Sequence, residues 1–176
     1  MKVSIRAHAL FSMALLAAGV AHAQNSPSAS ASLEIIRGHL ARQGQIAYAG
    51  TTHDSSTGQT WSTNFTVEAS NVTVDASGCE LRYHWHTWIN GKSSQELESG
   101  IEFGTAAEVT LISMAEDVNQ GTLKAGHPTW GTSIQPPLWV VHVARNDGSR
   151  ITMDFRDQAT AQLVANAAKQ AMRLCH

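Results

Sequence analysis

The sequence predicts an α+β fold in which an antiparallel β-meander of about six strands packs with an N-terminal and a C-terminal helix. Apolar residues recur at helical spacing near residues 33–43 and again over residues 157–175. Between these segments, residues 45–155 alternate with a period of two and are broken by clusters of Gly, Asn, Asp and Ser. The length of 176 residues suits a single domain over residues 33–176.

The N-terminus has the pattern of an export signal. Lys2 and Arg6 precede an apolar stretch, and Ala21-His22-Ala23 is a small-x-small cleavage site, so we expect residues 1–23 to be a signal peptide. The apolar stretch is shorter than the roughly 20 residues that span a membrane, and no lipoprotein cysteine follows it. We therefore expect a periplasmic or secreted protein without a membrane anchor after cleavage.

The composition after residue 23 predicts where the folded domain begins and which class of partner it does not bind. Residues 24–32 are rich in Ser, Ala and Pro and are expected to be a disordered leader. Loss of Lys2 and Arg6 leaves 10 basic residues against 14 acidic ones, so the net charge moves from -2 to -4. A chain of this charge offers no basic surface for nucleic acid. We expect a protein or cell-envelope partner instead.

The terminal helices follow from capping residues and apolar spacing. Ser32 can cap a helix over residues 33–43, which Gly44 ends. Asp157 can cap the last helix, and small or apolar residues share one of its faces at Val164, Ala168 and Cys175. This face would pack closely on a sheet.

The strands follow from alternation and turn signals. Apolar side chains alternate over residues 61–67 and over the long strand 79–89, and Asn90-Gly91 predicts a turn. Residues 109–114 are expected to be a strand, residues 138–145 a strand buried on both faces, and Asp147-Gly148 a hairpin turn. The Gly- and Pro-rich residues 119–137 are expected to be a long irregular loop with a functional role.

The two cysteines are Cys79 and Cys175. An even count in an exported chain predicts one disulfide, which would pin the last turn of the C-terminal helix to the start of a strand. The alternative is a reactive cysteine nucleophile, which needs a lowered thiol pKa.

Several segments resemble a family of small exported bacterial domains of unknown function. They are the opening helix, Ser77-Gly78-Cys79-Glu80-Leu81, Pro137-Leu138-Trp139-Val140-Val141, and Asp154-Phe155-Arg156-Asp157 leading to Arg173-Leu174-Cys175. The resemblance covers residues 33–175 and implies the same fold, a secreted location and the disulfide. It implies no catalytic residues.

Histidines supply the candidate metal ligands. His84 and His86 are two apart on one strand, so they share a face and could bind Zn²⁺ or Cu²⁺ with a third ligand from His53, His127 or His142. The alternative is that both lie on a solvated face. His142 falls in the strand expected to be most buried, where its imidazole needs a hydrogen-bond partner such as a carbonyl, Tyr or Thr.

Aromatic residues supply the candidate binding residues. Trp88 lies on the polar face of its strand, and His127 and Trp130 lie in the Gly/Pro segment. Exposed Trp is enriched where partners bind. The alternative for Trp130 is burial beside the core.

Three functions remain open. The first is a non-enzymatic binding or accessory domain of inhibitor or immunity type; the second is a metal-binding protein that uses His84 and His86; the third is a small envelope hydrolase. The sequence lacks the nucleophile, zinc-protease and phosphate-loop motifs, so no catalytic residue and no cofactor is predicted. A hydrolase would need a carboxylate pair from Glu68, Asp75, Glu80, Glu96, Glu98 or Glu102.

Overall fold

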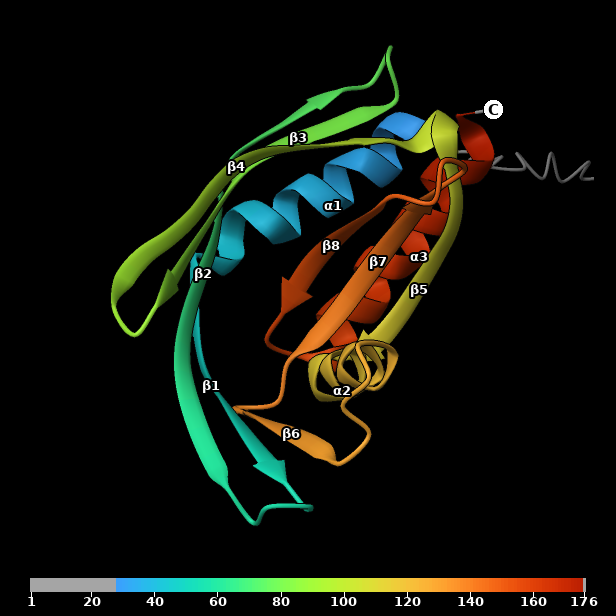
Figure 1. Cartoon of the computed structure of the whole chain (residues 1–176). Helices are drawn as coiled ribbons and strands as arrows, with labels where there is room; N and C mark the ends of the chain where they lie inside the picture. The colour runs from blue at the N-terminus through green and yellow to red at the C-terminus, as the bar shows by residue number, and fades with distance from the viewer. Residues whose placement is uncertain (1–27, 176) are drawn as a thin grey trace, which may run out of the picture.

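The computed structural model describes residues 28–175, which form three α-helices, eight strands and one short 3₁₀ helix (Figure 1). The elements in chain order are α1 Ala29–Gln43, β1 Gln45–Asp54, β2 Thr60–Asp75, β3 Glu80–Ile89, β4 Lys92–Glu102, η1 Phe103–Thr105, β5 Ala106–Ser113, α2 Met114–Lys124, β6 Trp130–Gln135, β7 Trp139–Arg145, β8 Arg150–Phe155 and α3 Gln158–Leu174. Residues 1–27, on which the predicted signal peptide falls, and residue 176 lie outside the described part.

The strands form two antiparallel sheets. Sheet A has the order β4-β3-β2-β1-β6, and sheet B has the order β5-β7-β8. The predicted α+β fold with terminal helices is confirmed, but there are eight strands rather than six. The prediction missed β4 because its sequence, KSSQELESGIE, has only two apolar side chains, Leu97 and Ile101, among polar ones, as an edge strand can have.

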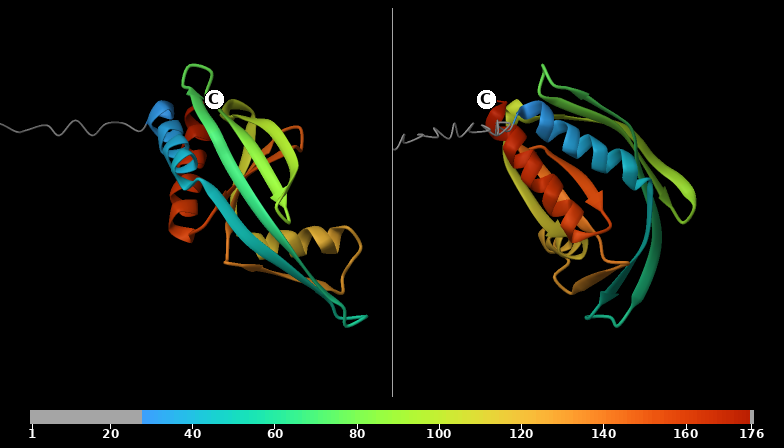
Figure 2. Two further views of the ribbon diagram at one scale, coloured as in Figure 1. Left: turned by 90° about the vertical axis from the view of Figure 1, so that its left-hand side faces the viewer. Right: turned by 180° about the vertical axis from the view of Figure 1, so that it is seen from behind.

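The core lies between the curved sheet A and sheet B (Figures 1 and 2). Helix α1 packs inside the curve of sheet A against β2 and also against α3. Its Leu33, Ile36 and Leu40 are fully buried beside Tyr83 of β3. Helix α3 covers one face of sheet B and buries small side chains there, Ala161, Val164, Ala165, Ala168 and Ala171.

Helix α1 begins earlier than expected. Ser28 is its N-cap and accepts a hydrogen bond from the Ala31 N–H at 3.1 Å, and Ser32 is buried within the first turns. Residues 29–32 therefore belong to the helix and not to a disordered leader. Sequence reasoning favoured Ser32 because the apolar spacing starts only at Leu33.

The segment expected to be a long loop is instead largely regular. Ser113 caps α2 by accepting from the Glu116 N–H at 3.2 Å, and acidic residues in the first turn favour the positive end of the helix. Helix α2 continues through Gly121, and strand β6 follows at Trp130. The prediction of residues 119–137 as irregular relied on the many Gly and Pro residues of this segment and was wrong for two of them. Gly121 lies within α2, where one glycine costs only about 1 kcal/mol, and Gly131 lies within β6.

Strand β7 and its hairpin agree with expectation. Val140, Val141 and Val143 are buried in the central strand of sheet B, covered on both faces. Gly148 has a φ of 83° in the turn between β7 and β8, where a residue without a Cβ is favoured.

The predicted disulfide joins Cys79 to Cys175, with the two Cα atoms 5.9 Å apart. It ties the end of α3 to the start of β3 beside η1, where Gly104 passes close to the Cys175 carbonyl. A disulfide is compatible with an extracytoplasmic location. Among residues 28–175, no helix is long and apolar enough to span a membrane.

We predict that the double substitution Cys79→Ala and Cys175→Ala lowers the free energy of unfolding by about 4 kcal/mol, because the bond closes a loop with a sequence separation of 96. Urea unfolding of both proteins measures the loss. Wild-type protein in dithiothreitol should then match the double variant. Equal stability of oxidised wild type and variant would contradict the prediction.

Candidate functional site

The candidate site lies on the inner face of the β1, β2 and β6 arm of sheet A. Because side chains alternate along a strand, Trp61, Thr63 and Phe65 of β2 share this face. The register places Tyr48 opposite Phe65 and Thr52 opposite Trp61 across the β1–β2 pair. Strand β6 extends the same surface from the other edge of β1.

Helix α2 lies over this surface and is fixed to the edge of sheet A by one side chain. The Asn119 Oδ1 atom accepts from the Thr132 N–H at 2.7 Å, and its Nδ2 atom donates to the Thr132 carbonyl at 3.1 Å. The amide group thus satisfies both backbone groups of an edge residue, as a neighbouring strand would. Met114 and Val118 of α2 consequently face the strands.

A cavity of about 370 Å³ lies between the arm and α2. This volume is within the range of small-molecule sites, roughly 300–1,000 Å³. Only aromatic, aliphatic, hydroxyl and glycine residues line it: Tyr48, Gly50, Thr52, Trp61, Thr63, Phe65, Met114, Val118, Thr132 and Ile134. The Thr52 and Thr132 hydroxyls are hydrogen bonded to each other at 2.8 Å.

Aromatic side chains gather in and beside the cavity. Tyr48 and Phe65 stack with ring centroids 5.1 Å apart. Trp61, which is 39% exposed, meets the half-buried Trp130 edge to face at 5.1 Å. The exposed His127 stacks on Trp130 with ring centroids 3.9 Å apart. The structure therefore places the predicted pair His127 and Trp130 next to Trp61, which also lines the cavity.

Gly50 leaves room in the cavity. A Cβ at this position would lie 3.4 Å from Phe65 Cε2 and 3.6 Å from Ile134 Cδ1, in ordinary contact with two lining side chains. Larger side chains at position 50 would therefore project into the space. Sequence reasoning passed over Gly50, Tyr48 and Phe65 because the pattern gave no sign of which strands would lie beside β6.

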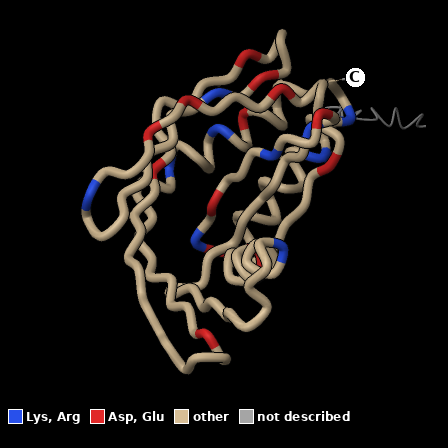
Figure 3. The backbone as a smooth tube through the Cα atoms, viewed as in Figure 1, with Lys and Arg blue, Asp and Glu red and all other residues tan. Residues whose placement is uncertain are grey.

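The cavity has no charge. No carboxylate, imidazole, amine or guanidinium group is among its lining residues. Burial, with a smaller contribution from the nearby Asp154, raises the pKa of the Tyr48 phenol, which stays protonated at neutral pH. Figure 3 shows the same arm of sheet A almost free of Lys, Arg, Asp and Glu.

Three other predicted site residues, His84, His86 and Trp88, lie on the opposite, outer face of sheet A. Trp88 stacks on His86 with ring centroids 3.7 Å apart, and His86 Nε2 is 2.8 Å from Ser93 Oγ. His84 is exposed on the same face, with Glu98 opposite it on β4. Trp88 thus forms no joint surface with Trp130 and His127.

Within the described residues, no group of three His, Cys, Asp or Glu side chains is placed to hold a metal ion. His84 and His86 share a face as expected, but neither His53, which lies 3.0 Å from Thr60, nor His142 joins them. Metal binding by His84 and His86 stays a prediction, which metal analysis of the purified protein can test.

The buried His142 has a carboxylate partner instead of the carbonyl or hydroxyl expected. His142 is 4% exposed, and its Nε2 donates to Asp117 Oδ1 of α2 at 3.0 Å. Arg150 Nη1 lies 3.4 Å from the same oxygen. Burial lowers the pKa of His142 although Asp117 opposes this effect, so the imidazole is neutral at pH 7. This contact fixes α2 to sheet B.

Asp154 is a second buried titratable group between the sheets. It is 6% exposed, and no side chain of the described residues forms an ion pair with it. Burial, and then the negative charge of Asp117, raise the pKa of Asp154 to about 7. Asp154 and His142 do not line the aromatic cavity.

Comparison with known proteins gives no relative: no family model, curated protein or solved structure matches the chain. The resemblance to small exported bacterial domains therefore rests on the sequence segments alone.

We predict that Asp154→Asn stabilises the protein more at pH 8 than at pH 5. A carboxyl whose pKa is raised by folding does not destabilise the folded protein at a pH below its unfolded pKa near 3.8. Above that pH the loss of folding free energy grows until the pH exceeds the folded pKa of about 7. A shift of this size corresponds to about 4 kcal/mol at most. Urea unfolding from pH 5 to pH 8 measures the difference between variant and wild type.

Asp147→Asn is the matched control. Hydrogen bonds from Ser149 lower the pKa of Asp147, so this carboxyl is ionised in both states from pH 5 to pH 8. The effect of Asp147→Asn on stability should therefore not change with pH in this range. If the effect of Asp154→Asn were also constant, Asp154 would titrate normally in the folded protein.

Proposed function

We propose that this protein is an exported, non-enzymatic binding domain that holds an uncharged, partly apolar group of a protein or cell-envelope partner. The observation that carries the proposal is the aromatic cavity between β1, β2, β6 and α2. A pocket lined mainly by apolar and aromatic side chains with a few polar groups is the usual form of a ligand site. The N-terminal signal pattern and the disulfide support a periplasmic or secreted location.

The lining residues favour binding over catalysis. General acid–base chemistry needs a titratable group within hydrogen-bond reach of the substrate and with a pKa near the working pH. Tyr48 is the titratable residue of the lining, and its pKa is raised away from neutrality. The threonine hydroxyls have no neighbouring base in the lining that could activate them.

The same residues define the group that fits. Tyr48, Phe65 and Trp61 offer ring faces and edges, which attract flat or ring-shaped groups. Thr63 offers a hydroxyl that can donate or accept a hydrogen bond. Thr52 and Thr132 are bonded to each other, so one of the pair keeps its proton for a ligand while both can still accept. A charged group would lose its hydration without gaining a partner, so the cavity selects against it.

A substitution that fills the cavity tests the proposal. We predict that Gly50→Val weakens binding of the neutral dye N-phenyl-1-naphthylamine at least about tenfold, because the new methyl groups occupy the space between Phe65 and Ile134. Dye fluorescence gives the affinity. Soluble muropeptides, added as competitors, test whether wall fragments occupy the same cavity.

Gly131→Val is the matched control on the same sheet. A Cβ at Gly131 meets no atom within 4 Å, and its partner His53 lies on the exposed side of β1. The control should bind the dye as the wild type does, and both variants should keep the wild-type melting temperature. Wild-type affinity in a folded Gly50→Val protein would overturn the proposal.

A further inference from the structure

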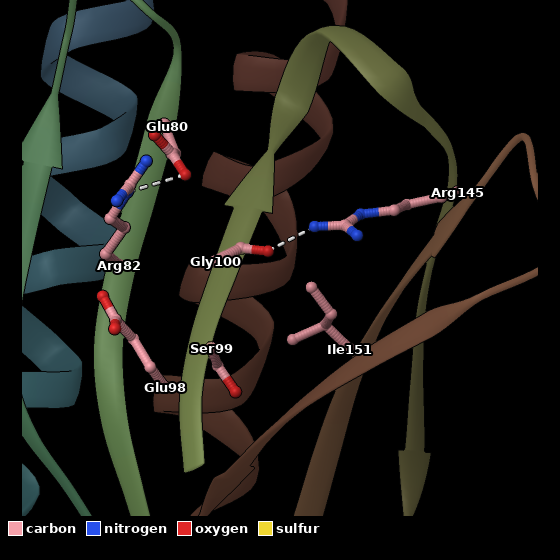
Figure 4. Close-up of a pocket in the computed structure, with 7 residues that line it drawn as sticks. All are labelled: Glu80, Arg82, Glu98, Ser99, Gly100, Arg145 and Ile151. Carbon is pink, nitrogen blue, oxygen red and sulfur yellow. Dashed lines mark hydrogen bonds and ion pairs between the residues drawn. The ribbon is translucent and has the colours of Figure 1, made fainter.

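A second concave region lies between the outer strands of the two sheets. Strand β4 is one edge of sheet A, and β8 is one edge of sheet B. Two cavities of about 450 and 230 Å³ lie between them and share Ser99 and Ile151 as lining residues. Together they form a groove along β4 from Gln95 to Gly100, hereafter the edge groove; Figure 4 shows its larger part.

The backbone of β4 is open toward this groove. The Phe103 N–H is bonded to the Cys79 carbonyl, so odd-numbered residues of the adjoining β4 segment pair with β3. The Gly100 carbonyl points the other way, because it accepts from the Arg145 guanidinium of β7. By the same alternation, the N–H and carbonyl of Glu98 point away from β3. The N–H of Gly100 also points away from β3. An added strand could bond to these groups.

The groove also contains a cation without a carboxylate partner. Arg145 forms no ion pair within the described residues, although Asp147 lies near enough for Arg145 to contribute to its lowered pKa. Its Nη2 donates to the neutral Gly100 carbonyl, and its Nε is buried with no hydrogen-bond partner. By contrast, Arg82 on the β3 side is paired with Glu80 at 2.8 Å. A guanidinium binds carboxylates in preference to neutral carbonyls.

We propose that the edge groove binds an extended peptide of a partner protein, which adds to β4 as a strand and places an Asp or Glu side chain against Arg145. In strand addition, backbone hydrogen bonds provide affinity and side-chain pockets provide specificity. The floor provides such pockets through Tyr83, Trp85 and Leu97. This site is separate from the aromatic cavity and does not depend on its function.

The charges argue against a second copy of this chain as the occupant. Strand β4 carries Glu96, Glu98 and Glu102, so pairing of two β4 edges would bring like charges together. A small anion alone would leave the backbone groups of Glu98 unused. An extended peptide with one acidic side chain at Arg145, and no other negative charge beside Glu96 and Glu98, satisfies both the open backbone and Arg145.

Peptide selection on the mature protein provides the test. A display library of ten-residue peptides is selected on the immobilised wild type, and the best peptide is synthesised and titrated. We expect the selected peptides to contain Asp or Glu and to slow hydrogen exchange at the Glu98 and Gly100 amides. Arg145→Gln should weaken binding by about ten- to a hundredfold, because a charge-assisted hydrogen bond contributes about 1.5–3 kcal/mol. Lys92→Gln, at the far end of β4, should leave the affinity unchanged.

A pair of substitutions at position 98 separates backbone from side chain. Glu98→Pro removes the outward N–H and should therefore abolish binding. The variant should still fold, because proline is tolerated on an edge strand where its nitrogen faces solvent. Glu98→Gln keeps the N–H and removes a negative charge beside the peptide, so it should bind at least as tightly as the wild type. Peptide binding that survives Glu98→Pro in a folded protein, or that is lost in Gly50→Val, would overturn the groove proposal. A library that yields no peptide with a Kd below about 100 µM would do the same.

Discussion

Filling the concave face of sheet A is the constraint on which the rest of the structure depends. A strongly curved five-stranded sheet exposes apolar side chains on its inner side, and burial of these side chains is the main driving force for folding. Helix α1 fills the part beneath β2 and β3, where Leu33, Ile36 and Leu40 are completely buried. Helix α2 covers the β1, β2 and β6 arm less tightly, and the aromatic cavity is the space that remains.

Two polar contacts hold α2 at this distance. Asn119 joins the helix to β6 of sheet A, and Asp117 joins it to His142 of sheet B. Since each contact involves a buried or partly buried group, breaking either one would leave a polar atom without a partner. Helix α2 is therefore attached to both sheets. This double attachment explains how α2, a short helix with one buried residue, Met114, stays fixed over the aromatic cavity.

The sequence predicted those elements whose signals are local. The period of residues 157–175, the Asp147-Gly148 turn and the apolar run of β7 each carry their own evidence, and the cysteine count predicted the disulfide. Strand β6 could not be predicted in this way, because its pairing with β1 joins residues about 80 positions apart. For the site, His127 and Trp130 could be predicted as binding residues from their residue types alone. Tyr48, Phe65 and Gly50 could not, because they line the cavity only as a result of the β1–β6 pairing.

The Asn119 amide also closes one side of sheet A to any further strand. It occupies the outward backbone groups of Thr132 on β6, so sheet A has one closed edge and one open edge at β4. Fibrous aggregation requires that each molecule both offer and accept an edge, so that growth can continue in two directions. Growth through sheet A would therefore end after one addition at β4. The same side chain that positions α2 over the cavity thus limits edge-to-edge assembly through sheet A.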